Sequence, residues 1–414
     1  MDTSAAYVRG DEQLHEQTRA RLVAVVGSDA ADLGRVAGEV AHRLHESGQE
    51  PDFEVRSADF ATDPFFVCAD RYWRRRFADS PSSATALACA RWIAAHTTAG
   101  CRSAVREQWA LGNGFINRSH LETREQLDEA ARALTGTPEA AELALTVLLY
   151  NAGKLRANFA FDDLNAVLTA SALATLAGAH RNEAIVLALR SFAAFGSRSL
   201  TTEHARDLLD RAWAAAADRP GHVMDVCLNG LAVSVPFDGQ GELLRRLAQE
   251  AVESAPGNHM FRFRLATAHH LCADHDEALV HLDAALALLA RSGAFSRELL
   301  LEQYLVKRDA IQEARLRAAR EAEHEGRWQR QDAANADLER AMHRSSIRAV
   351  ELVAVFTSAI AFAVGSLQVT LSGTLKLRER LWLLTALGAG LAVFALLIVG
   401  GTWLITRTRT RTRR

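Results

Sequence analysis

Residues 353–371 read VAVFTSAIAFAVGSLQVTL and residues 381–405 read LWLLTALGAGLAVFALLIVGGTWLI, without a charged side chain in either stretch. At a rise of about 1.5 Å per residue, a helix of either length can cross a hydrocarbon core of about 30 Å, the first only just. A core helix of this length usually keeps a polar stripe, which both stretches lack. The two stretches therefore predict a C-terminal transmembrane helical hairpin that anchors the chain in a lipid bilayer.

Basic residues flank this hairpin on its two outer sides, at Arg344 and Arg348 before it and at Arg407, Arg409 and Arg411 after it. Because basic residues are retained on the cytoplasmic side, this pattern predicts a multi-pass protein of the cytoplasmic (inner) membrane with both termini in the cytoplasm. The connecting loop, 372–380, is also basic and weakens the prediction. The first residues do not form a basic segment followed by an apolar run, so we expect no cleaved signal peptide.

Small residues recur four positions apart in both stretches, at Ala361 and Gly365 and at Ala386 and Gly390. Such pairs let helix backbones approach closely in lipid, where burial of apolar surface gives no drive to associate. We expect them to pack the hairpin on itself or on neighbouring copies, which would make a homo-oligomer.

The region 141–290 has the pattern of short amphipathic helices joined by a few turn residues. Helices are predicted at 182–195, 202–216, 223–233, 241–254, 259–272 and 276–289. Short helices with short connections form antiparallel helical hairpins, and proline is scarce, so the sequence predicts an all-α fold.

Residues 261–290, FRFRLATAHHLCADHDEALVHLDAALALLA, resemble a tetratricopeptide repeat (TPR), and the preceding hairpin resembles it one period of about 34 residues earlier. Arg262 departs from the pattern, because the family often has tryptophan there. The matching small and large positions are Leu231, Ala232, Ala251, Leu265, Ala266, Ala278, Leu282 and Ala285. The resemblance implies a solenoid with a concave surface that binds a peptide or a protein partner.

The chain divides on these patterns into five parts. They are an N-terminal, mostly helical domain of unknown type (1–140), TPR-like repeats (141–292), a long charged stalk helix (293–348), two transmembrane helices (349–406) and a basic cytoplasmic tail (407–414). In the first part, LVAVVGSDAADLGRVAGEVAHRL, 22–44, predicts a strand, a turn and a helix capped by Ser28 or Asp29. It is superficially like a phosphate-binding loop but lacks that motif's Lys-Ser/Thr ending.

No motif for catalysis, a cofactor or a metal emerges. The five cysteines are scattered, the histidines at 269, 270, 275 and 281 have no completing ligands, and no metalloprotease, hydrolase, nucleotide or kinase signature occurs. A net charge of −2 does not favour nucleic-acid binding. The sequence therefore predicts neither an enzyme nor a cofactor, and its alanine- and arginine-rich composition is typical of high-GC bacteria.

Three functions follow, in order of preference. The first is a membrane-anchored protein whose repeats bind a protein partner at the cytoplasmic face of the membrane. The second is a sensor-effector, because repeats, a stalk and paired C-terminal spans resemble two-transmembrane effectors of bacterial conflict and antiphage systems; its hairpins would oligomerise and permeabilise the membrane. The third is an unrecognised enzyme in residues 1–140.

Overall fold

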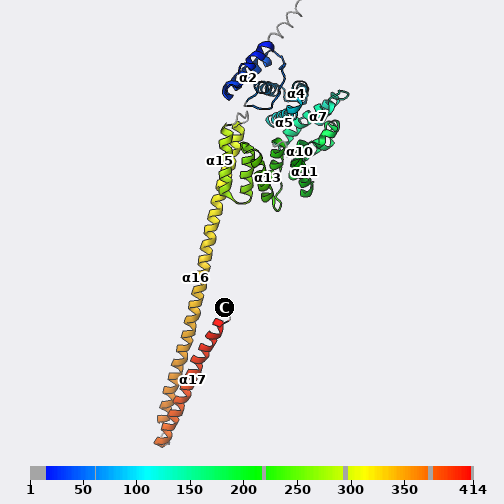
Figure 1. Ribbon diagram of the computed structural model, residues 1–414. Helices are drawn as coiled ribbons and strands as arrows, with labels where there is room; N and C mark the ends of the chain where they lie inside the picture. Colours follow the sequence, from blue (N-terminus) through cyan, green and yellow to red (C-terminus); the bar gives the residue numbers. More distant parts are fainter. Residues whose placement is uncertain (1–14, 61, 217–220, 292–296, 372–375, 412–414) are drawn as a thin grey trace, which may run out of the picture. The chain divides into compact units, whose positions relative to one another are not determined.

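The computed structural model describes residues 15–60, 62–216, 221–291, 297–371 and 376–411 (Figure 1). In these ranges every regular element is a helix, and the extended backbone amounts to one isolated bridge between Val55 and Thr97. The predicted all-α class is therefore confirmed. The chain forms two compact units, Met1–Arg315 and Leu316–Arg414, each of which is described separately below.

The first part of unit 1 is built from residues 15–23, which are helical, and from six further helices. They are α2 (Ala30–Glu46), α3 (Pro64–Asp79), α4 (Ser83–His96), α5 (Ala99–Ile116), α6 (Arg124–Arg132) and α7 (Ala140–Ala157). Rings from three of these helices meet in the core: Trp109 stacks on Phe66 and on Trp92, with 5.8 Å between ring centroids in each pair. All three residues are at most 2 % exposed, so this aromatic cluster joins α3, α4 and α5.

The strand predicted from residue 22 onward is wrong. Residues up to 23 belong to a helix, and a turn follows before Asp29 caps α2 by accepting a hydrogen bond from the Asp32 amide at 2.8 Å. The apolar run is buried on one side only, since Leu22 is fully buried whereas Val23 and Val26 are more than half exposed. One-sided burial without a partner strand is compatible with a helix end and not with a sheet.

The second part of unit 1 continues with short helices. They are α8 (Phe161–Ala170), α9 (Ala172–Leu176), η1 (Gly178–Asn182), α10 (Ala184–Gly196), α11 (Thr202–Ala215), α12 (His222–Val233), α13 (Gln240–Ser254), α14 (His259–Leu271) and α15 (His275–Arg291). From α10 to α15 each helix begins and ends within about two residues of its predicted bounds. Helix α10 packs on both α11 and α12, α12 packs on α14, and α14 packs on α13 and α15.

Two glycines let α5 and α7 cross at short range. A Cβ atom added to Gly114 would overlap the carbonyl oxygen of Tyr150, and one added to Gly153 would lie 3.1 Å from the carbonyl oxygen of Leu111. Backbone atoms cannot move aside as a flexible side chain can, so the crossing requires glycine at Gly114 and leaves little room for a side chain at Gly153.

A buried ion pair fastens two loops to α7. The Lys154 ammonium, 1 % exposed, donates to Glu122 Oε2 at 2.7 Å and to the carbonyl oxygens of Pro81 and His120 at 3.2 and 2.5 Å. Burial lowers the pKa of Lys154, and the Glu122 carboxylate counteracts this shift. These three acceptors replace the water that would otherwise hydrate the ammonium group. The cation thereby joins the segments before α4 and α6 to α7.

Helix α16 (Arg297–Leu371) begins in unit 1 and continues into unit 2, where it is followed by α17 (Leu377–Arg411). The predicted stalk and the first apolar stretch therefore lie in one helix. Within the described residues, one helix is long and apolar enough to cross a membrane, and none of its apolar window, in α16, is buried. The second predicted span lies in α17, where the side chains at 395, 398–399 and 401–411 are outside those described.

Candidate functional site

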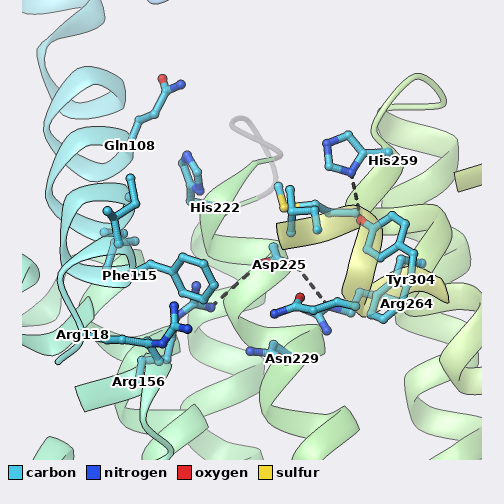
Figure 2. Close-up of a pocket in the computed structure, with 18 of the residues that line it drawn as sticks. Gln108, Phe115, Arg118, Arg156, His222, Asp225, Asn229, His259, Arg264 and Tyr304 are labelled. Carbon is cyan, nitrogen blue, oxygen red and sulfur yellow. Dashed lines mark hydrogen bonds and ion pairs between the residues drawn. The ribbon is translucent and has the colours of Figure 1, made fainter. Parts of the chain in front are cut away.

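Unit 1 contains a cavity of about 440 Å³ whose walls come from both of its parts (Figure 2). One wall is formed by Arg74, by α5 and the residues after it, and by the C-terminal end of α7. The other is formed by the first turns of α12, α14 and α16. Its polar side chains are Arg74, Gln108, Arg118, Arg156, His222, Asp225, Asn229, His259, Arg264, Gln303 and Tyr304. A cavity of this size is typical of small-molecule sites.

Asp225 is the one carboxylate among the described lining residues, and two arginines hold it. Arg264 Nε donates to Asp225 Oδ1 at 3.0 Å, and Arg156 Nη1 lies 3.8 Å from Asp225 Oδ2 (Figure 2). Asp225 is only 4 % exposed. Burial raises the pKa of its carboxyl, but the charges of Arg264 and Arg156 outweigh this, so the pKa lies below its usual value.

Two further arginines face the cavity. Arg74 has a buried partner, because its Nε donates to Asp70 Oδ2 at 2.6 Å. Arg118 forms no ion pair with a carboxylate in the described part of the chain, and its guanidinium lies over the Phe115 ring, 5.3 Å from the centroid. Because Arg74 is paired with Asp70, three arginines of the lining remain, and Asp225 is the one described carboxylate that can balance them.

Burial disfavours the charged form of both histidines of the cavity. Burial lowers the pKa of His222 and that of His259, and the nearby Asp225 only partly offsets the shift. His259 Nδ1 lies 2.9 Å from the Tyr304 hydroxyl, and the Tyr304 ring stacks on Phe263 with 4.3 Å between centroids. These contacts hold α16 at Tyr304 against α14.

Aromatic rings make up much of the apolar lining. They are Phe60, Phe115, Phe159, Phe263 and Tyr304. Phe159 is 53 % exposed and has a φ of 54°, a left-handed conformation that is strained for a bulky residue. The described lining has no serine, threonine, cysteine or lysine, and its carboxylate, Asp225, is held by arginines.

The residues predicted to pack the repeats lie in the interior. Seven of the eight are fully buried, and Ala232 is partly buried. Ala266, Ala278, Leu282 and Ala285 form a small core with Tyr304 and Ile311 of α16. None of the eight positions lines the cavity.

The residues predicted to pack the membrane hairpin are only partly brought together. A Cβ atom on Gly365 would lie 2.8 Å from Leu387 Cδ2, and one on Gly388 would lie 3.5 Å from Phe362. Gly390 has nothing within 4 Å, and Ala361 and Ala386 are exposed. Arg344 and Arg348 are exposed on α16, whereas the side chains of Arg407, Arg409 and Arg411 lie outside those described.

Sequence reasoning missed the cavity, although the repeat period carried a signal for one wall. Asp225 and His259 are one period apart, as are Asn229 and Phe263, and all four line the cavity. Equivalent positions of successive repeats lie on one face, so that wall could have been found from register alone. No spacing in the sequence relates this wall to Phe115, Arg118 or Arg156.

No protein-family model matches the chain, and neither a curated protein nor a solved structure matches it. The site must therefore be interpreted from its own geometry.

Proposed function

We propose that the protein is a membrane-anchored, TPR-like helical-repeat protein that binds a protein partner at the cytoplasmic face of the membrane. The observation that carries the proposal is the apolar stretch of α16. Phe356, Ile360 and Leu367 are each more than 60 % exposed, and among the described residues none of the apolar window of α16 is buried. Large apolar surfaces of this kind mark contact with lipid or with another protein.

The repeat assignment is supported by the way α10 to α16 pack. The first helices of successive hairpins, α10, α12 and α14, contact one another, while α11, α13 and α15 are the second helices. In a solenoid of this kind the first helices line a common concave face. The cavity opens on the first turns of α12, α14 and α16, so this face carries the polar and aromatic groups that a partner would contact.

The hairpin and its orientation complete the proposal. The contact between Gly365 and Leu387 supports close packing of α16 on α17, and the exposed Arg344 and Arg348 support a cytoplasmic position for the residues before the first span. Association of hairpins from several copies would use the small residues that α16 and α17 leave uncovered.

Two measurements test the proposal. The full chain should stay with membranes through a high-salt wash and through alkaline extraction, and should be released by detergent; release by salt would refute the anchor. A photo-crosslinking residue at Asn229, in the cavity wall of α12, should capture the partner, whereas the same residue at the exposed Gln249 of α13 should not. Equal capture from both positions would refute the assigned face.

A sensor-effector is the second candidate, and the bounds of α16 favour it. The same helix supplies Leu300, Gln303 and Tyr304 to the cavity and contains the apolar stretch from Val353 to Leu371. One helix therefore contains both residues of the cavity wall and the predicted first span. Forced oligomerisation of residues 346–414 should then collapse the membrane potential and stop growth, and unchanged potential would refute this function.

A further inference from the structure

We propose that the cavity binds a nucleotide, with its phosphate at Arg118 and Arg156 and its base among the aromatic rings. This site requires neither the membrane anchor nor the protein partner. It can therefore be tested separately from both, and its failure would leave the function proposed above intact.

The charges of the cavity call for an anion. The lining contains the positive charges of Arg118, Arg156 and Arg264, and Asp225 is the one carboxylate among its described residues. His222 and His259 add no negative charge. Half-buried charges in a cavity are screened less than those on an open surface, so the positive excess attracts a ligand of opposite charge. The same excess disfavours a cationic or a wholly neutral ligand.

One arginine of the cavity holds a donor ready for such an anion. Arg156 Nη1 is buried and has no hydrogen-bond acceptor, because its ion-pair distance of 3.8 Å to Asp225 Oδ2 is too long for a hydrogen bond. Buried donors are almost always satisfied in folded proteins, and an orphan one requires an explanation. Arg118 lies on the same side of the cavity and also has no described carboxylate partner (Figure 2). Two guanidinium groups together offer the paired donors that phosphate oxygens accept.

The aromatic rings provide the second half of the ligand site. Phe115 already lies under the Arg118 guanidinium, and Phe263 and Tyr304 form a stacked pair on the opposite wall. Phe159 is kept half exposed in a strained left-handed conformation, which is typical of residues held for function. Planar bases stack on phenylalanine, tyrosine and arginine faces without a demand for a particular base.

The size of the cavity decides between a nucleotide and simpler anions. A volume of about 440 Å³ is much larger than a lone phosphate needs, and it lies in the range of small-ligand pockets. The walls come from α3, α5, α7, α12, α14 and α16, so the lining residues surround a space of small-ligand size from several sides. A ligand that satisfies charge, rings and volume together carries both a phosphate and a planar ring.

Calorimetric titration of the full chain in detergent tests the site. The probes are a panel of ribonucleoside mono-, di- and triphosphates, the parent nucleosides, inorganic pyrophosphate and a glutamate-rich peptide. We expect at least one nucleotide to bind ten times or more tightly than its nucleoside and than pyrophosphate. No binding by any nucleotide, or binding no tighter than pyrophosphate, would overturn the proposal. Binding by the acidic peptide alone would also overturn it and would assign the cavity to the protein partner.

Variants locate the binding. Arg118→Gln should weaken the nucleotide by about ten- to a hundredfold, because it removes a charged hydrogen bond without orphaning a carboxylate. Arg132→Gln, an exposed arginine of α6 outside the lining, is the matched control and should leave the affinity unchanged. Phe115→Leu should weaken nucleotide and nucleoside alike but leave pyrophosphate unaffected. Equal affinities for Arg118→Gln and the parent chain, at equal melting temperatures, would refute the placement of the phosphate.

Discussion

Ile360 and Leu338 offer a direct test of whether lipid or water surrounds α16. Both side chains are 63 % exposed on the same helix, but Ile360 lies in the uncharged stretch and Leu338 in the charged one. Exposure alone therefore predicts the same response to substitution at the two positions. If a bilayer covers the uncharged stretch, the response to aspartate differs sharply.

The magnitude follows from the cost of a carboxylate in hydrocarbon. At the centre of a membrane helix isoleucine contributes about −0.3 to −0.6 kcal/mol and aspartate about +2.5 to +3.5 kcal/mol, so Ile360→Asp costs roughly 3 to 4 kcal/mol. That is roughly a hundred- to a thousandfold shift in the insertion equilibrium. In water, Leu338→Asp costs less than about 1 kcal/mol, from helix propensity alone.

The assay measures insertion of the first span in the full chain. Lys376→Cys places a thiol between the two apolar stretches, and an impermeant maleimide applied to intact cells labels it only when the first stretch has crossed. Four of the five native cysteines are buried, and all five precede α16, so they give little background. Ile360→Asp should abolish labelling and Leu338→Asp should not.

Alkaline extraction of the membrane fraction makes the same comparison without any assumption about sidedness. Ile360→Asp should shift chain into the extract, and Leu338→Asp should behave as the parent does. If the two variants behave alike in both assays, the uncharged stretch lies in water or against protein, and the reasoning is refuted.

Three further outcomes are expected in thermal unfolding of the full chain. Lys154→Met should destabilise unit 1 by about 3 to 5 kcal/mol, because Glu122 stays buried without its partner; adding Glu122→Gln should recover most of the loss. Gly114→Ala should cost about 1 to 3 kcal/mol through overlap with α7, whereas Gly112→Ala on the same helix, with nothing within 4 Å, should be neutral or stabilising. Burial and neighbouring cations lower the pKa of His270 to about 4, below its usual value of 6.5, so its contribution to stability is present above pH 6.5 and is lost as the pH falls toward 4; His270→Gln should flatten that part of the profile.

The helices of the second part of unit 1 could be predicted because each of their signals is local. Asn258 caps α14 and Thr201 caps α11, each by accepting an amide hydrogen bond from the first turn, and glycine or proline lies between several of the helices. Periodicity then fixes which face is buried, as the fully buried Leu265 and Leu282 illustrate. Local signals of this kind can be detected in a single sequence.

The cavity could not be predicted because its two walls are distant in the sequence. Arg118 follows α5 and Arg156 ends α7, while Asp225 belongs to a helix nearly seventy residues further on, and no period relates these positions. The crossing of α5 and α7 at Gly114 and Gly153 brings the ends of these two helices together, and it depends on close packing between their backbones. Many glycines in helices do not mark a helix crossing, so the sequence alone does not reveal this one.

The same contrast applies to α16, in which a predictable property and an unpredictable one share a helix. Its uncharged stretch is evident from composition, whereas the position of Tyr304 against His259 and Phe263 depends on tertiary packing. A ligand in the cavity can influence the membrane stretch only if it binds two arrangements of α16 with different affinity. Tyr304 can provide such a difference, because its ring stacks on Phe263 and its hydroxyl lies within hydrogen-bond distance of His259, both on α14. A ligand that displaced Tyr304 would free this part of α16 from α14, whereas one that stacked on the ring would hold the contact in place.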